Sequence, residues 1–198
     1  MKQTERREQS IQTLLNATKR LIKEKGCDST TLTDMMKYSG LSKGAIFHYV
    51  KTKDEIYTLV LLDRLEEINA RFQKQVNKAK KEFEGPLHEI TQNMITLNAS
   101  NEITNQILVY LLSKTGRPEI DFALKEFYNH SVSMSRQWIE IGKKHNVIPD
   151  TIDTMKAGEL FVLLSLGFRM RAYIPSEEKD FQEDDFIDLI RGTLQPEN

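Results

Sequence analysis

The sequence predicts an all-α protein, with a small N-terminal helical domain followed by a larger C-terminal helical domain. Three observations support this class. Apolar residues recur three and four positions apart through nearly every segment, as on one face of a helix. No segment alternates apolar and polar residues as a strand does, and Gly and Pro cluster between the segments. At 198 residues, 39% hydrophobic and 29% charged, the chain suits one or two ordinary domains.

The first three predicted helices lie close together along the chain. The first has apolar residues at positions 11, 14, 15, 21 and 22 and ends near Gly26. Thr31 and Asp34 form a capping box at the start of the second, and Gly40 is suited to the left-handed conformation that ends it. Ser42 caps the third, which we expect over about residues 43–50. Two short helices joined by such a turn form a helix-turn-helix, whose second helix enters the DNA major groove.

The third helix has the composition of a DNA-reading helix. Lys43 can reach a phosphate or a guanine edge, Gly44 and Ala45 permit close approach, and Ile46 faces inward. The residues that we expect at the DNA are Thr31, Ser42, Lys43, Gly44, Ala45, Phe47, His48, Tyr49, Lys51 and Lys53. The alternative for any one of them is an ordinary core aromatic or a solvated lysine.

The distribution of charge supports DNA binding, although the net charge of −1 does not. Residues 1–55 contain 11 Lys and Arg against 7 Asp and Glu, a net charge of +4. The remainder contains 17 against 22, a net charge of −5. A basic N-terminal segment on an acidic body is expected of a duplex-binding domain attached to a second domain.

Six more helices are expected in the rest of the chain, over about residues 54–82, 87–99, 103–113, 119–144, 151–173 and 181–194. Gly85-Pro86, Gly116-Arg117-Pro118, Pro149 and Pro175 separate them. Residues 157–168 are so apolar that we expect burial on nearly every side. Such burial indicates either a subunit interface or the chain's own core.

Four short runs resemble the N-terminal DNA-binding domain of the tetracycline-repressor (TetR) family. They are Thr30-Thr31, Gly40-Leu41-Ser42-Lys43-Gly44, Phe47-His48-Tyr49-Val50 and Thr52-Lys53-Asp54-Glu55. The detailed resemblance covers roughly residues 8–62, and the rest agrees in length and helical character. The family often has Tyr where Phe47 stands and Phe where Val50 stands, so one phosphate contact is expected to be lost.

The resemblance implies a DNA-binding domain over residues 1–52 and a ligand-binding and dimerisation domain over residues 53–198. Family members pair through their last two helices as a four-helix bundle. The corresponding interface residues here would be Leu160, Leu163, Leu164, Gly167, Phe168, Phe186, Leu189 and Ile190. A ligand cavity would be lined by Met94, Leu97, Tyr110, Phe122, Phe127, Tyr128, Met134, Trp138 and Phe161, which suit an apolar or aromatic ligand but equally suit plain core.

The function that the resemblance implies is a homodimeric transcriptional regulator. Most relatives repress, so we expect a repressor that binds a palindromic double-stranded operator and is released by an unidentified small molecule. A helical DNA-organising or adaptor module without ligand control is the alternative.

Other chemistry is poorly represented. Four scattered histidines and the single Cys27 do not suggest a metal site, and we expect no cofactor. The run from Asp184 to Asp188 spells DDxxD, as in all-helical diphosphate-metabolising enzymes, but acidic residues also favour the first turn of any helix. We therefore expect no enzyme. The chain has no apolar run of about 20 residues and no signal peptide, so a cytoplasmic protein without a membrane segment is expected.

Overall fold

The computed structural model describes residues 3–48, 50–78, 82–175 and 180–195. Within these ranges the chain is helical without any strand, which confirms the predicted all-α class. The helices are α1 (Gln3–Ser29), α2 (Leu32–Ser39), α3 (Lys43–Phe47), α4 (Lys53–Val76), α5 (Glu84–Leu97), α6 (Ile103–Leu112), α7 (Pro118–Lys144), α8 (Thr154–Arg171) and α9 (Glu183–Leu194). No helix in the described ranges has both the length and the apolar character needed to cross a membrane.

The chain divides into two compact units. The first comprises Met1–Arg64 and Ile103–Phe127, and the second comprises Leu65–Glu102 and Tyr128–Asn198. Long helices α4 and α7 each contribute residues to both units. These units are not the two domains expected from the sequence, since the first unit contains α6 as well as the N-terminal helices. The functional boundary expected after residue 52 stays a prediction.

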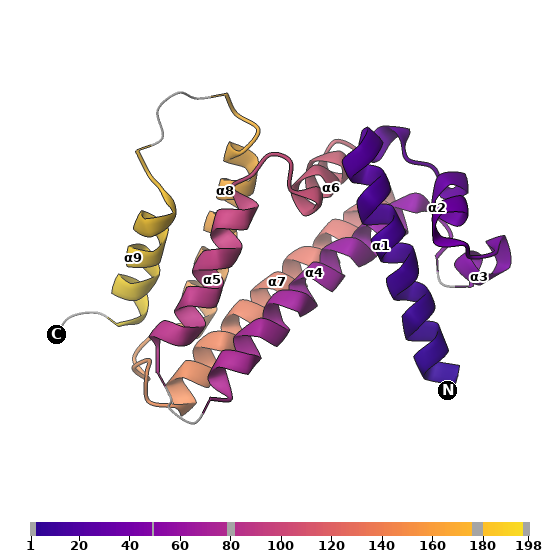
Figure 1. Cartoon of the computed structure of the whole chain (residues 1–198). Coiled ribbons are helices and arrows are strands. Elements are labelled where there is room, and N and C mark those ends of the chain that lie inside the picture. The colour runs from indigo at the N-terminus through magenta and orange to yellow at the C-terminus, as the bar shows by residue number, and fades with distance from the viewer. Residues whose placement is uncertain (1–2, 49, 79–81, 176–179, 196–198) are drawn as a thin grey trace. The chain divides into compact units, whose positions relative to one another are not determined.

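In the first unit, α1 packs against both α2 and α6. Figure 1 shows α2 lying beside α1, with α3 beyond α2. The side chains of Leu14, Ile22, Met35, Ile46 and Ile56 are almost completely buried. Gly26 has a φ of 77° and interrupts the helical backbone of α1, as the predicted helix end near this residue required.

Several predicted helix limits are wrong by three or more residues, among them the start of α8, which is Thr154 and not about residue 151. Helix α3 ends at Phe47 and α4 ends at Val76, both earlier than expected. Pro86 does not precede α5 but lies in its first turn, where a proline costs no hydrogen bond because the first N–H groups of a helix have no intrahelical partner. The spacing of apolar residues identifies a helix but says little about a polar segment at its end. It therefore locates helix ends poorly.

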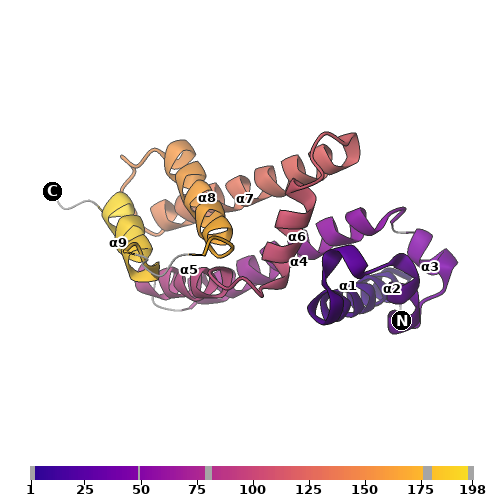
Figure 2. The ribbon, with the colours of Figure 1, turned by 90° about the horizontal axis from the view of Figure 1, so that it is seen from above.

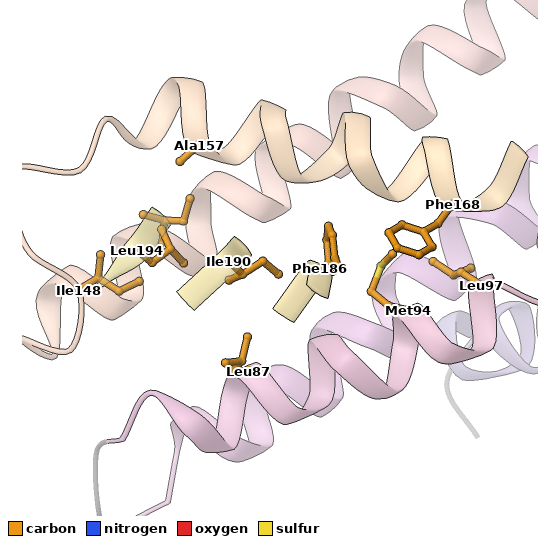
Figure 3. Packing of buried hydrophobic residues seen from close by; sticks show 10 residues of the cluster. Leu87, Met94, Leu97, Ile148, Ala157, Phe168, Phe186, Ile190 and Leu194 are labelled. Atoms are coloured by element: carbon orange, nitrogen blue, oxygen red, sulfur yellow. The ribbon is translucent and has the colours of Figure 1, made fainter. Parts of the chain in front are cut away.

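The second unit is built around a hydrophobic core between α5, α8 and α9. Helix α5 packs against α8 and against α9, and the three can be followed in Figure 2. Figure 3 shows side chains from these helices converging on one another. The buried members are Leu87, Met94, Leu97, Ile139, Ile148, Ala157, Phe168, Phe186, Ile190 and Leu194.

Helix α8 has apolar residues on every side, but it is not buried on nearly every side as the sequence suggested. Ala157 and Phe168 face the core described above. On another face, Met155, Leu160 and Leu163 have exposed fractions of 58%, 40% and 53%. The sequence shows which residues of α8 are apolar. Which of its faces are buried depends on how many other helices of the chain pack against it.

Candidate nucleic-acid interface

Local hydrogen bonds fix the two helices of the helix-turn-helix. The Thr31 hydroxyl accepts from the Asp34 N–H at 3.2 Å, and the Asp34 carboxylate accepts from the Thr31 N–H at 2.9 Å. This confirms the predicted capping box. Gly40 ends α2 with a φ of 69°, and Ser42 caps α3 by accepting from the Ala45 N–H at 3.2 Å. These bonds hold the start of α3 in place.

Helix α3 turns Ile46 inward and presents Lys43, Gly44 and Phe47 to solvent. Ile46 is completely buried. Lys43, Gly44 and His48 are exposed, and Phe47 has an exposed fraction of 42%. The Lys43 ammonium lies 5.6 Å from the centre of the Phe47 ring. An exposed cation, an exposed aromatic ring and a glycine on one short helix suit contact with a phosphate backbone and base edges.

The other residues expected at the DNA differ in availability. Thr31 and Ser42 use their hydroxyls as caps, and Ala45 is half-buried. Lys51 is exposed, but its N–H donates to the Glu55 carboxylate at 2.8 Å. This backbone N–H is therefore already bound by a carboxylate of the chain and is not available to a phosphate. Tyr49 lies outside the described residues.

Lys53 is turned into the protein. Its ammonium donates to the carbonyls of Cys27 and Asp28 at 3.1 Å and to that of Thr30 at 3.0 Å. These carbonyls follow the break at Gly26, so one ammonium satisfies the end of α1. Burial and the charge of Lys114 lower the pKa of Lys53. A phosphate contact through this ammonium would have to replace these bonds.

Aromatic side chains surround Lys53 and join α6 to the start of α4. The Tyr110 hydroxyl donates to the Asp54 carboxylate at 2.9 Å and accepts from the Lys114 ammonium at 2.5 Å. The Tyr57 hydroxyl donates to the Cys27 carbonyl at 2.7 Å. The two tyrosine rings meet edge to face, with centres 5.2 Å apart. Burial raises the pKa of both tyrosines and raises that of the Cys27 thiol to about 12.

The Asp34 carboxylate gives the helix-turn-helix a predictable acid sensitivity. Hydrogen bonds from the Lys25 ammonium, 2.5 Å away, and from Thr31 hold its pKa well below the usual range. Because the pKa is lower in the folded chain, the carboxylate stabilises the fold above about pH 4 and loses this effect as the pH falls. We expect Asp34→Asn to lower stability at pH 7 and to flatten its decline between about pH 5 and pH 2. Urea unfolding measured against pH checks this.

The control for that prediction is Asp150→Asn. Asp150 is exposed, and its backbone carbonyl, not its carboxylate, accepts a hydrogen bond from Lys143. It should unfold like the wild type at every pH. Equal acid sensitivity of the wild type and Asp34→Asn would contradict the capping role of the carboxylate.

The expected interface residues fall into two groups. Phe168, Phe186 and Ile190 are buried in the core of the second unit, and half-buried Leu164 packs against it. Leu160, Leu163, Gly167 and Leu189 are exposed. A second chain can therefore contact the latter group without rearrangement of the core.

The expected ligand residues are distributed over several environments. In the first unit, Tyr110 and Phe127 are buried, whereas Phe122 has an exposed fraction of 65%. In the second unit, Met94, Leu97 and half-buried Phe161 belong to the core and Met134 is buried. Trp138 stacks on Phe72 with ring centres 4.4 Å apart and donates to Asn69 at 2.9 Å. Tyr128 lines a surface hollow of about 360 Å³ on α7 and α8.

Sequence reasoning missed the residues that hold Lys53 and the start of α4. Tyr57 and Lys114 belong to none of the quoted runs, and the partners of Asp54 and Tyr57 lie 56 and 30 positions away in the sequence. The spacing of Lys53 and Tyr57, four residues apart on one helix, was the available signal.

The acidic run at the start of α9 has structural roles. Asp185 forms a capping box with Gln182, and Asp188 pairs with Arg191 at 2.8 Å. Among the described residues, no group of three or more His, Cys, Asp or Glu side chains is placed to hold a metal ion.

Comparisons with known proteins agree with this geometry. Residues 14–60 match the family model of bacterial regulatory proteins, tetR family. No match was found among curated proteins. The members of the matched family are transcriptional regulators and not enzymes, which agrees with the expectation, made from the sequence, that this chain is not an enzyme.

Solved structures share the fold over nearly the whole chain. A TetR-family transcriptional regulator from Pectobacterium atrosepticum is 18% identical, covers 100% of both chains and gives a TM-score of 0.63. A TetR transcription regulator from Haloarcula marismortui is 19% identical, with 94% of this chain and 95% of that chain covered and a TM-score of 0.62. SmeT in complex with triclosan is 15% identical, with 92% and 90% covered and a TM-score of 0.62. The segment from residue 14 to residue 60 thus belongs to the tetR family of bacterial regulatory proteins, and the chain as a whole has the fold of the family's transcriptional regulators.

Proposed function

We propose that this chain is a homodimeric transcriptional repressor that leaves its operator when a small apolar or aromatic molecule binds. The observation that carries the DNA-binding part is the orientation of α3. Buried Ile46 anchors the helix, and exposed Lys43, Gly44 and Phe47 form its outer side. A DNA-binding regulator acts where the chromosome is, so we propose a cytoplasmic location.

The apolar exposed side of α8 supports pairing with a second copy. Leu160 and Leu163 are large, exposed and close in sequence, and contiguous exposed apolar surface usually marks an interaction site. Two-fold pairing would place two reading helices about 34–36 Å apart, one DNA turn, on a palindromic operator. Leu189 of α9 would join this interface.

Release by a ligand requires that the ligand bind one conformation of the chain better than another. SmeT, which shares the fold, has been solved with triclosan, an apolar aromatic molecule. This similarity supports an effector of the same chemical class here. Reciprocal linkage then sets the effect on operator affinity, typically about 1–3 kcal/mol.

The contact between Tyr110 and Asp54 is our candidate for the last step of that coupling, because it joins α6 to the first turn of α4. We expect Tyr110→Phe and Asp54→Asn each to change operator Kd by about three- to tenfold, and the double variant to change it no further. Fluorescence anisotropy with labelled operator measures all four proteins. Additive effects would show that the hydroxyl and the carboxylate act independently.

Selection of binding sites from a random DNA duplex pool, at two salt concentrations, tests the proposed function. Enrichment of a two-fold-symmetric site, lost with Lys43→Ala, is the expected result. Salt-sensitive binding without an enriched site would favour a DNA-organising role, because non-specific affinity comes almost entirely from phosphate contacts. The selected operator then permits screening of apolar and aromatic molecules for release.

A further inference from the structure

A carboxylate lies in the middle of the exposed apolar side of α8. Met155, Glu159 and Leu163 are spaced four residues apart, so they follow one another along the same side of the helix. Met155 and Leu163 have exposed fractions of 58% and 53%, and the Glu159 side chain has one of 46%. One turn further on, Gly167 is also exposed, and no atom lies within 4 Å of where its Cβ would be.

Two side chains of α7 hold this carboxylate in place. The Tyr128 hydroxyl donates to Glu159 Oε1 at 2.7 Å. Arg136 Nη2 lies 3.5 Å from Glu159 Oε2 and donates to the Met155 carbonyl at 3.3 Å. The hydrogen bond to Glu159 raises the pKa of Tyr128. A positive and a negative group are thus fixed side by side at the edge of the apolar surface.

The backbones of α7 and α8 approach closely at this point. A Cβ on Gly158 would lie 2.6 Å from Arg136 Cγ and 3.2 Å from the Arg136 backbone nitrogen. A Cβ at this position would require Arg136 to shift, so the glycine allows the backbone and Cγ of Arg136 to lie directly against α8. The fold therefore places Arg136 and Glu159 side by side, and the bonds from Tyr128 and Arg136 orient the carboxylate.

The same side of the unit is hollowed. Tyr128, Asn129, Val132, Ser133, Arg136 and Glu159 line a hollow of about 360 Å³. Because Glu159 belongs both to this lining and to the row that contains Met155 and Leu163, the concave surface adjoins two protruding apolar side chains. A surface with an adjoining hollow and protrusion can fit a copy of itself when a two-fold axis passes between them.

We propose that a second copy of this chain covers this side, and that Arg136 and Glu159 of each copy face the opposite charge on the other. The inference rests on the proposed homodimer and adds the residues that set its register. Under two-fold symmetry a surface that carries both charges side by side is complementary to itself. Fixed charges within an apolar interface restrict which register and which partner are tolerated, since a shifted copy would bring like charges together.

Charge reversal tests this arrangement. Arg136→Glu leaves two carboxylates on the surface and Glu159→Arg leaves two guanidinium groups, so each variant alone should dimerise at least about tenfold more weakly. A mixture of the two variants should form a heterodimer that is more stable than the homodimer of either variant. The double variant Arg136→Glu/Glu159→Arg, with the charges exchanged in one chain, should regain the homodimer. Sedimentation equilibrium measures all of these, and circular dichroism confirms that each variant is folded.

Arg71 and Glu89 provide the matched control. They form an ion pair of 3.7 Å between α4 and α5 in the same unit. Arg71→Glu and Glu89→Arg should leave the dimerisation constant of the wild type unchanged, with no preference for the mixed pair.

The outcomes separate this inference from the proposed function. A wild type that dimerises, with variants at residues 136 and 159 that dimerise equally well and mix at random, would overturn the inference and leave the homodimer intact. A wild type that binds its operator as a monomer would overturn both. If a single variant does not fold, the comparison of the double variant with the wild type decides.

Discussion

Replacing Gly44 with leucine should reduce operator binding by at least about a hundredfold without weakening the fold. A Cβ on Gly44 meets nothing within 4 Å and Gly44 is exposed, so a larger side chain can extend into solvent in the free protein. Leucine also favours a helix over glycine by up to about 1 kcal/mol. On DNA, the same side chain would occupy the space that a phosphate or base edge needs beside Lys43. Fluorescence anisotropy with the selected operator and urea unfolding measure the two effects separately.

The control for this substitution is Asn16→Leu. Asn16 is exposed on α1, outside the helix-turn-helix, and the change again adds an exposed leucine. It should bind the operator as the wild type does. Tight operator binding by Gly44→Leu would mean that α3 does not approach DNA with this side.

Lys53→Met should lower the free energy of unfolding by about 2–3 kcal/mol. Methionine keeps much of the length of the side chain but cannot donate to the three carbonyls of Cys27, Asp28 and Thr30. These acceptors follow the break in α1, and a hydrogen bond from a charged group is worth about 1.5–3 kcal/mol. Urea unfolding followed by circular dichroism gives the value.

The matched control is Lys37→Met on α2, where the lysine is exposed and its change should cost no more than about 0.5 kcal/mol. Comparison with Lys43→Ala separates stability from DNA contact. Lys43→Ala should weaken operator binding and leave the free energy of unfolding unchanged. Lys53→Met should weaken operator binding because it lowers the free energy of unfolding. If Lys53→Met unfolded like the wild type, the role of Lys53 would be a contact with DNA.

The helix-turn-helix was predictable in detail because its signals are local. A capping box needs two residues three positions apart, and a left-handed helix end needs glycine at one position. Thr31, Asp34, Gly40 and Ser42 meet these requirements within the sequence itself, and the structure has each cap as predicted. The inward orientation of Ile46 follows from the same short helix.

The role of Lys53 was not predictable in the same way. From the sequence it is a cation at a helix start, close to the reading helix, and DNA contact was the natural expectation. Its carbonyl partners lie 23 to 26 residues earlier and are within reach only because the fold brings the start of α4 to the end of α1. Backbone carbonyls leave no trace in residue identity, so no pattern in the sequence reveals them.

Helix α8 shows what the sequence by itself determined and what only the tertiary structure decided. The sequence determined that this segment is a helix with apolar residues on every side, because these properties depend on residue type and spacing. The tertiary structure decided that Phe168 lies in the core and that Leu163 lies at the surface, because α5 and α9 cover one side of α8 and leave another exposed. It also placed Arg136 and Tyr128 of α7 beside Glu159, since burial and charge pairing depend on which helices meet.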